Sequence, residues 1–568
     1  MAASSSSFTT SVVPQSKNDF EMAERKLPQI SIGELRREEE QDDGTALDND
    51  EPFDPTLSTA SDRYQMNRMG KQQAFVRHFK PMATFSFNAM ATCVWEFGIF
   101  SVSQGLVDGG RAGLFWSTVV HAVGFVPVVL SMAEMASIAP TAGGQYHWVS
   151  ELAHPKWQKP LSYITGWIST MAWQAGNAVG VFLTGTLIQV IILENNPNYM
   201  FPAWHGSLLV MTNIVFTVAG NILLSRYIPR VQTLFFVLHI LAFLCVIVPI
   251  LVNAPKASAA EVFTEFDNTG GWPNTGVAVL AGQLSAIYMM CGTDSAHISE
   301  EVKSAGRTVP KSMISVYGVN MVITLTCWLV ICFAMPNVNA ALADPSLYPV
   351  IYIMKQSMSI KWVTVELTMI VALVLFANVC YLTAVSRDLF AFARDGGTPC
   401  PNWVARVHPK YGVPINAGGS HTSIFTETAH TDVGAVYVTG GFSFILSLIY
   451  IGSPTAFYAI TSLMTVALLQ CYMFSIGSIL WRRIYHPSTI PKSHFSLGKW
   501  GLPINAVAVV WCLWSFIFSF FPMYKDVTTG TFNWASVIFV AVLVCAGVHW
   551  FAYGHKTYQG PVVLVRKL

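Results

Sequence analysis

The chain has 568 residues, of which 52% are hydrophobic and only 11% charged, and its mean hydropathy is +0.45. A soluble domain carries roughly a quarter charged residues, so this composition excludes an ordinary soluble protein and indicates a membrane protein. The net charge of +1 provides no general attraction for nucleic acid or for an acidic partner. The ten cysteines show no zinc-ligand or redox spacing, so we expect no metal, no cofactor and no disulfide framework.

The first 70 residues differ in composition from the rest of the chain. They open with MAASSSSFTTSVVPQSKNDF and pass through the acidic run REEEQDDGTALDNDEPFDP, with no periodic apolar residues. Such a segment cannot bury enough surface to order itself, so residues 1–70 are predicted to be a disordered tail. The segment also lacks the pattern of a secretory signal peptide. We expect a membrane domain over residues 71–553 and a short tail over residues 554–568.

Apolar segments follow one another from Pro81 to the end of the membrane domain. Each is near the length of about 20 residues that crosses a hydrocarbon core. Short apolar runs can also be buried core helices, but so many in series favour membrane spans. The twelve predicted spans are 81–106, 112–138, 160–193, 206–225, 231–252, 276–302, 315–334, 359–384, 436–451, 455–480, 502–522 and 532–553. The ninth is the weakest.

Basic residues are distributed unequally between the two sets of loops that these spans define. One set holds only Arg111, Lys256, Lys355, Lys361 and Lys525, whereas the other set, with the flanks, holds all the remaining Lys and Arg outside the distal tail. Cytoplasmic loops are the ones enriched in Lys and Arg. Both termini are therefore predicted to be cytoplasmic.

Two spans contain polar interruptions. The first reads PMATFSFNAMATCVWEFGIFSVSQGLVDGG, and the sixth ends in YMMCGTDSAHISEEVKSAGRTVP, where Gly292 precedes Thr293 and Asp294. These spans are five apart, as an inverted five-plus-five repeat requires, and matching broken helices in such repeats frame one site. Unwound backbone must face protein or a polar cavity, where its N–H groups suit an anion and its carbonyls a cation. Alternatively, Gly292 simply ends the span and Asp294 caps a short helix.

The chain also resembles a known family. SMAEMASIAPTAGGQYHWVSE, SRDLFAFARDGG and TFNWASVIFV with the closing YQGP look like signatures, in the expected order, of the fungal amino acid/GABA/choline permeases of the amino acid-polyamine-organocation superfamily. The resemblance extends from about residue 65 to the end. It implies an all-α, twelve-helix, LeuT-like carrier with broken helices 1 and 6, working by alternating access. The substrate is then expected between spans one, three, six, eight and ten.

The resemblance assigns site residues to the two interruptions. The first-span motif Thr-Trp-Glu of the family falls on Val94, Trp95 and Glu96, and the sixth-span motif begins at Gly292. This chain lacks one residue of the motif between Ala296 and His297, and in a helix such a deletion rotates the subsequent residues by about 100°. The predicted substrate-binding residues are Ala91, Thr92, Cys93, Val94, Glu96, Cys291, Gly292, Thr293 and Asp294. A carboxylate at membrane depth, such as that of Glu96, is functional by default, although it can also be structural.

Ion coupling is predicted at His239 in FFVLHILAF, because related carriers couple to protons through a basic residue on the fifth span, and this span has no Lys. Histidine changes charge nearest to cellular pH. The alternative is a packing role. Thr383 and Ser386 in span eight offer hydroxyls that could coordinate sodium instead. Fungal plasma-membrane carriers of this kind imply protons.

Gating or structural roles are predicted for Glu134, Gly143, Gly144 and Arg394. For Glu134, a pair with a loop arginine is preferred to direct substrate contact. A second departure from the family is the polar insertion GGSHTSIFTETAHTDVGA at residues 418–435, before the ninth span. It is either a real loop or an artefact of the gene model, such as a retained intron.

The sequence therefore predicts a secondary active transporter that imports an amino acid or a related amine such as GABA or choline, with proton coupling preferred to sodium coupling. The rival is a membrane sensor that binds the same ligand without flux. The chain shows no catalytic constellation, so we do not expect an enzyme. The predicted location is the plasma membrane, with the vacuolar membrane as the alternative. The family resemblance implies that ubiquitin machinery acts on tail lysines such as Lys17 and Lys26.

Overall fold

The computed structural model describes residues 59–71, 75, 77–224, 227–292, 296–405, 433–449 and 456–561. Every regular element in these ranges is a helix, with a single β-bridge between Phe79 and Val302. Most of the predicted tail and most of the polar insertion at residues 418–435 lie outside the described ranges.

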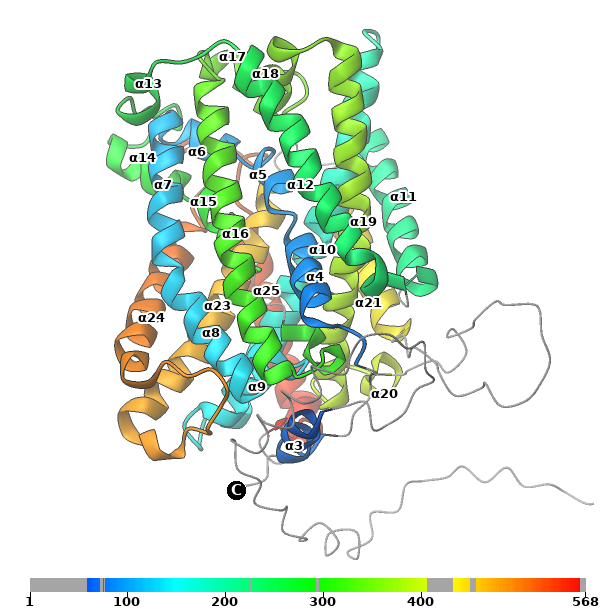
Figure 1. The fold of residues 1–568 in the computed structure, drawn as a ribbon, viewed down its shortest axis with the longest axis vertical. Helices are drawn as coiled ribbons and strands as arrows, with labels where there is room; N and C mark the ends of the chain where they lie inside the picture. Colours follow the sequence, from blue (N-terminus) through cyan, green and yellow to red (C-terminus); the bar gives the residue numbers. More distant parts are fainter. Residues whose placement is uncertain are drawn as a thin grey trace, which may run out of the picture. The chain divides into compact units, whose positions relative to one another are not determined.

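Ten helical segments among the described residues are long and apolar enough to cross a membrane. The first is divided into α4 (Pro81–Thr92), α5 (Val94–Gly98) and α6 (Ser103–Val107), and the second into α7 (Gly110–Gly124) and α8 (Val126–Ile138). The other eight are α10 (Gln158–Asn195), α11 (Ala203–Leu224), α12 (Ile228–Asn253), α16 (Ala305–Phe333), α19 (Ile360–Arg394), α23 (Ala456–Tyr485), α24 (Gly501–Phe518) and α25 (Ala535–His549). Figure 1 shows that most of them run side by side along the long axis of the view.

The sixth and ninth predicted spans correspond to shorter helices. The sixth is formed by α14 (Thr275–Gly282) and α15 (Leu284–Met290), and the ninth by α21 (Val433–Ser447). The sixth helix therefore stops well before residue 302, where the sequence prediction ended it. Gly292 has a φ of +83°, a conformation that interrupts a helix and that glycine adopts easily.

Burial separates inner from outer helices. In the most apolar window of each span, 89% of the residues are buried in the first span and 78% in α10, against 17% in the last span that includes α25. Outer helices remain apolar although they are little buried, which is stable only against lipid. The inner helices therefore surround whatever site the bundle holds.

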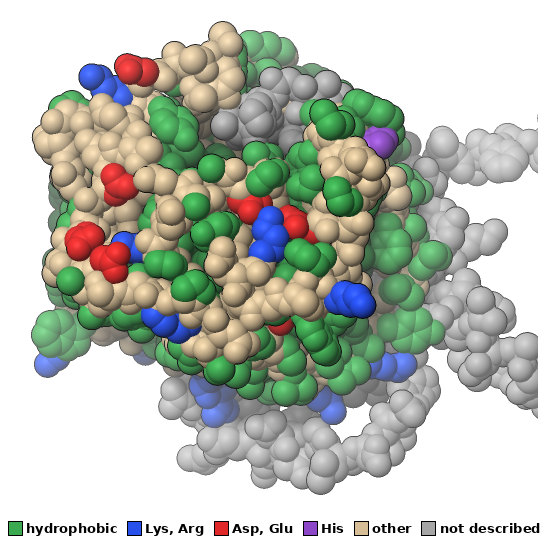
Figure 2. Space-filling view, turned by 90° about the horizontal axis from the view of Figure 1, so that it is seen from above, with side chains coloured by type: hydrophobic (Ala, Val, Ile, Leu, Met, Phe, Trp, Pro, Cys, Tyr) green, Lys and Arg blue, Asp and Glu red, His purple; other side chains and the backbone are tan. Residues whose placement is uncertain are grey.

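The two ends of the bundle carry different short elements. One end, called here the α3 end, holds α3 (Ala60–Arg68), α9 (Gly144–Leu152) and α20 (Pro401–Val404), and the opposite end holds α13 (Ala259–Phe263), α17 (Val338–Leu342) and α18 (Pro349–Ser357) (Figure 1). Figure 2 shows the face opposite α3, where the few Lys and Arg side chains lie among acidic and apolar groups. An ion pair of this kind joins Lys355 to Glu194 at 2.9 Å.

Helix α3 lies inside the stretch predicted as a disordered tail. Its Asp62 carboxylate accepts hydrogen bonds from the backbone N–H groups of Ser304 and Ala305, at 2.9 and 3.0 Å, at the start of α16. Asp62 also pairs with Arg77 at 3.2 Å. Order here comes from contacts with distant segments, because α3 itself has almost no amphipathic pattern. The predicted C-terminal tail likewise begins with packed residues, since Tyr558 is fully buried.

A second contact fixes the other end of α3. Arg68 donates to Glu151 at 2.5 Å and to the backbone carbonyl of Ile138 at 2.8 Å. Burial alone would raise the pKa of Glu151, but Arg68 and His147 outweigh it and hold that pKa at about 2. Because this folded-state pKa lies below that of an unpaired carboxyl, the pair stabilises the protein at neutral pH. The stabilisation is lost as the pH falls from about 4 towards 2.

We expect Arg68→Ala to lower the free energy of unfolding by about 3 kcal/mol or more, because it leaves the Glu151 carboxylate buried without its partner. Chemical unfolding of the purified protein in detergent measures this change. Arg63→Ala, the same substitution at an exposed position of α3, should change stability by about 1 kcal/mol or less. Equal effects of the two substitutions would contradict the role given to Arg68.

Candidate binding cavity

The first span is broken at Cys93. Helix α4 ends at Thr92, Cys93 has a left-handed conformation with φ of 39° and ψ of 49°, and α5 begins at Val94. Such a conformation is unfavourable for a residue with a Cβ by about 1–2 kcal/mol. Packing must hold this residue in place, and Cys93 is fully buried. The break is thus a defined feature of the fold rather than a frayed end.

The sixth span is broken opposite the first. Cys291, after α15, has an extended conformation, and the backbone N–H of Gly292 donates to the Tyr472 hydroxyl at 3.2 Å. The chain resumes as the 3-10 helix η4 (Ala296–Glu301). Thr293 and Asp294 lie outside the described residues. The two breaks agree with the predicted interruption of spans one and six.

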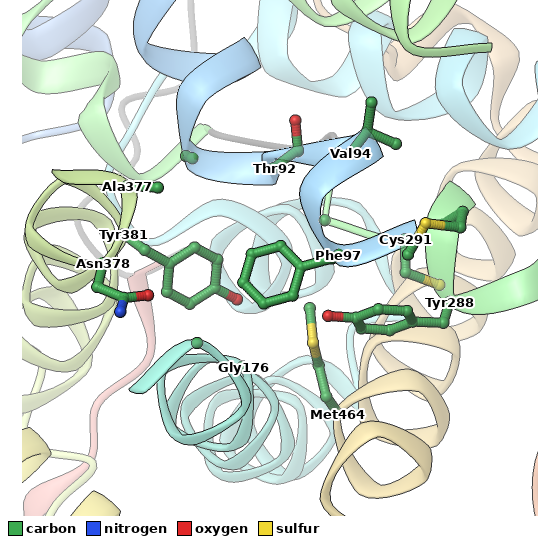
Figure 3. Close-up of a pocket in the computed structure, with 14 residues that line it drawn as sticks. Thr92, Val94, Phe97, Gly176, Tyr288, Cys291, Ala377, Asn378, Tyr381 and Met464 are labelled. Carbon is green, nitrogen blue, oxygen red and sulfur yellow. The ribbon is translucent and has the colours of Figure 1, made fainter. Parts of the chain in front are cut away.

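A cavity lies between the two breaks, and about 540 Å³ of space in and at the opening of this cavity is free of protein atoms. It is lined from α4 and α5, α10, α15, α19 and α23, which are spans one, three, six, eight and ten (Figure 3). These are the five spans from which the family resemblance implies a substrate site. The fourteen lining residues are Ala91, Thr92, Val94, Phe97, Gly176, Gly180, Tyr288, Met289, Cys291, Gly292, Ala377, Asn378, Tyr381 and Met464.

Of the nine predicted substrate-binding residues, the seven that the structure describes divide into two groups. Those that line the cavity are Ala91, Thr92, Val94, Cys291 and Gly292. Cys93 and Glu96 do not line it, because the left-handed turn at Cys93 places Glu96 beside span five. The side chains of the first group offer few polar contacts, since the Thr92 hydroxyl already donates to the Ala89 carbonyl at 2.9 Å.

Most side chains that give the cavity its chemistry were missed in the sequence. Phe97, Tyr288, Tyr381 and Met464 look like ordinary core residues when they stand in apolar helices. Figure 3 shows Phe97 between the rings of Tyr381 and Tyr288 in this view, with Met464 nearby. The one usable sequence signal was the pair of glycines four residues apart in span three, Gly176 and Gly180, which marks a helix face open to close approach.

No lining side chain in the described part of the chain carries a formal charge. The three aromatic rings of Phe97, Tyr288 and Tyr381 can attract a cationic nitrogen through their faces. The backbone at the two breaks offers polar groups for the remainder of a small ligand. The arrangement suits a small organic amine better than a metal ion or a highly charged anion.

Glu96 and His239 form a buried pair beside the cavity. Glu96 Oε1 and His239 Nδ1 are 2.7 Å apart, the two side chains are 0% and 1% exposed, and the rings of Trp95 and Phe236 lie against the imidazole. With Cys93 they form a group whose metal-ligating atoms lie within 4.8 Å of one another. A separation of 2.7 Å is that of a hydrogen bond, whereas two ligands of one tetrahedral zinc ion stand about 3.3 Å apart. The geometry therefore favours a proton shared between the two side chains.

The two hydroxyls suggested for sodium both make hydrogen bonds within the bundle. Thr383 accepts from Asn221 at 2.8 Å and donates to the Val379 carbonyl at 3.1 Å. Ser386 donates to the Thr383 carbonyl at 3.0 Å. Neither residue lines the cavity.

The residues predicted to gate or support the bundle lie towards the α3 end. Glu134 pairs with Arg483 at the end of α23 and accepts from the backbone N–H of Leu497 at 2.9 Å. The partner is thus an arginine of the last turn of α23 rather than one in a loop. Arg394 makes two hydrogen bonds to the Glu300 carboxylate, at 2.9 and 3.1 Å.

Gly143 and Gly144 begin α9 beneath the cavity. Gly144 has a φ of +47°, and a Cβ there would lie 3.1 Å from the ring of His297 in η4. A Cβ at Gly143 would lie 2.8 Å from the ring of Tyr146. Gly144 therefore allows close packing between α9 and the segment that comes after the sixth-span break, whereas Gly143 leaves room for a ring of α9 itself.

A helical membrane bundle with a cavity between two broken spans is the architecture of a membrane transporter. Residues 81–544 match the family model described as amino acid permease, and the chain belongs to this family. It is therefore a permease, a class of transporter rather than of enzyme. The predicted family and its all-helical, LeuT-like fold are confirmed.

Individual relatives cover nearly the whole membrane domain. A protein from Macrophomina phaseolina is 29% identical over 80% of this chain and 97% of its own length. The GABA-specific permease of Saccharomyces cerevisiae is 28% identical over 89% of this chain and 86% of its own. The crystal structure of a mutant manganese transporter from Eremococcus coleocola aligns with a TM-score of 0.50 over 91% of this chain and 97% of that chain. At 12% identity, that likeness shows the fold alone.

We expect Gly176→Ala to weaken uptake of a transported substrate at least about fivefold, because the added methyl would overlap the Tyr381 hydroxyl and push it into the cavity. The concentration dependence of uptake measures the change. Gly318→Ala adds the same methyl to α16, where it would meet no atom within 4 Å, so uptake should stay normal. An unchanged affinity in a well-folded Gly176→Ala protein would show that Tyr381 does not shape the site.

Proposed function

We propose that this permease is a secondary active transporter that imports an organic amine or amino acid, such as GABA or choline, by alternating access coupled to protons. The observation that carries the proposal is the cavity between the breaks at Cys93 and Gly292. Broken helices that meet at a cavity are how carriers of this architecture hold a small substrate.

The chemistry of the cavity supports an amine as substrate. Its aromatic rings suit a cationic nitrogen, and the chain is similar to a permease named for GABA. Val94 replaces the small polar residue usual in the family and reduces polarity where a carboxylate of an α-amino acid would dock. The sequence adds Asp294, outside the described residues, as a carboxylate that could neutralise the amine.

The pair formed by Glu96 and His239 supports protons as the coupling ion. It joins the first span, which lines the cavity, to the fifth span, which does not. Protonation of His239 would charge a group buried in the bundle and thereby change its attraction for Glu96. A change in the charge of either partner would therefore alter the contact between span one and span five.

The orientation of the protein in the membrane and the membrane that holds it are proposed from the sequence. The excess of Lys and Arg supports a cytoplasmic α3 end, with both termini on that side, and we place the protein in the plasma membrane rather than the vacuolar one. Attachment of ubiquitin to Lys17 or Lys26 would give a means of withdrawal from that membrane. The domain limits, a carrier domain at residues 71–553 between two tails, remain part of the proposal.

Flux through purified protein in vesicles tests the function. With a proton gradient imposed, labelled GABA or choline should accumulate above its external concentration, and a protonophore should abolish the accumulation. Saturable binding without flux would support the rival hypothesis of a membrane sensor. Accumulation driven by a sodium gradient alone would overturn the proton coupling.

We expect His239→Ala to flatten the pH dependence of uptake and to reduce accumulation against a gradient, while substrate binding stays within about threefold of wild type, because His239 lies outside the cavity. Uptake measured from about pH 5 to about pH 8, the range in which histidine titrates, records the profile. His121→Ala is the matched control, since His121 is also buried in a span but bonds Gln283 at 2.7 Å, away from Glu96. An unchanged profile in His239→Ala would make His239 a packing residue.

A further inference from the structure

One polar side chain in the cavity has a fixed orientation. Asn378 extends from α19 towards α10, and its amide Nδ2 donates to the Thr184 hydroxyl at 3.0 Å (Figure 3). That hydroxyl in turn donates its own hydrogen to the Gly180 carbonyl at 2.9 Å. Because the only hydrogen of the Thr184 hydroxyl is committed, the side chain facing it must be a donor. The nitrogen of Asn378 therefore points to Thr184 and the oxygen points away from it.

The oxygen of this amide lies against a glycine. A Cβ at Gly180 would overlap Asn378 Oδ1, so the absence of a side chain there is what admits the amide. Oδ1 accepts no hydrogen bond from the described part of the chain, and yet it is not among the fully buried unpaired atoms. Asn378 is only 3% exposed and lines the cavity, so the cavity is where Oδ1 meets solvent or a ligand.

An accept-only oxygen in this place discriminates between two kinds of amine. The rings of Phe97, Tyr288 and Tyr381 attract any cation, whether or not it carries N–H groups. Tyrosine hydroxyls can rotate and can both donate and accept. Asn378 Oδ1 can only accept, and Thr184 prevents the amide from turning over. A ligand without a hydrogen on its cationic nitrogen leaves this oxygen dehydrated and unpaired.

We propose that Asn378 is a specificity-determining residue that makes the cavity prefer a primary ammonium over a quaternary ammonium of the same skeleton. The proposal rests on the proposed transport function and names the substrate class within it, an amine with N–H groups on the charged nitrogen. A site that hydrogen-bonds a substrate rejects the analogue lacking that donor more strongly than an apolar pocket rejects an extra methyl group. The expected preference is on the order of tenfold to hundredfold.

Two matched pairs of compounds test the preference in the full-length protein in vesicles. GABA is compared with its N,N,N-trimethyl derivative, and ethanolamine with choline, by the concentration of each labelled compound that gives half-maximal uptake or binding. The primary amine of each pair should give half-maximal uptake or binding at a concentration at least about tenfold lower than the quaternary amine does. Equal or better performance of the quaternary members in the wild-type protein would overturn the proposal while the transport function stands. If neither pair is bound or taken up, the proposed function fails, and the proposal fails with it.

Substitutions at and near Asn378 test whether this residue causes the preference for primary amines. Asn378→Leu removes the acceptor. It should weaken the uptake or binding of the primary amines at least about tenfold and leave that of the quaternary amines within about threefold of wild type. Asn378→Asp retains an acceptor towards the cavity and should keep the preference, with the Thr184 hydroxyl turning its hydrogen from the Gly180 carbonyl to the carboxylate. Gly180→Ala, which displaces the oxygen, should reproduce Asn378→Leu, whereas Gly477→Ala in α23 meets no atom within 4 Å and should not. If the Asn378→Leu protein prefers primary amines as strongly as the wild-type protein does, the selectivity comes from another group.

Discussion

The inability of lipid to satisfy backbone hydrogen-bonding groups determines where everything else in this bundle lies. Two spans are broken, at Cys93 and after Met290, and each break leaves polar backbone that must be enclosed by protein or by a polar cavity. Both breaks consequently face the interior, and the first span is the most buried span of the described chain. Because both breaks lie inside one bundle and their polar backbone groups must be kept away from lipid, a cavity between the breaks follows from the same constraint.

Helix α10 shapes that space through its glycines, which have no side chain. Four glycines of α10 are so close to a residue of a neighbouring helix that a Cβ at the glycine would overlap that residue. The close pairs are Gly166 with Phe392, Gly176 with Tyr381, Gly180 with Asn378 and Gly185 with Val210. In membranes, small residues let helices approach without a hydrophobic driving force between them. Two of these contacts, at Gly176 and Gly180, line the cavity. Close packing against α19 and the chemistry of the site therefore both depend on Gly176 and Gly180.

The sequence predicted the main features of the fold because they have strong local signals. Long apolar segments, Glu96 inside the first span and Gly292 inside the sixth are visible without any structure. The cavity lining was much less visible, since a Tyr or Asn in an apolar helix gives the same pattern whether it faces a cavity or a neighbouring helix. Helix α3 could not be predicted because its order depends on partners such as Glu151 and Arg77, which only the fold brings near.

The layer of ion pairs at the α3 end is compatible with the movement that the proposed function requires. At about 1.5 Å per residue, Arg394 lies about 20 Å along α19 from Tyr381 in the cavity, so its pair with Glu300 separates the site from that end. Removing one partner leaves a buried, uncompensated charge and is strongly unfavourable. Opening the bundle instead admits water to both partners, and a hydrated pair contributes only about 0–1 kcal/mol. The same contacts can therefore hold the closed state firmly against mutation and still separate readily when water enters from the α3 end.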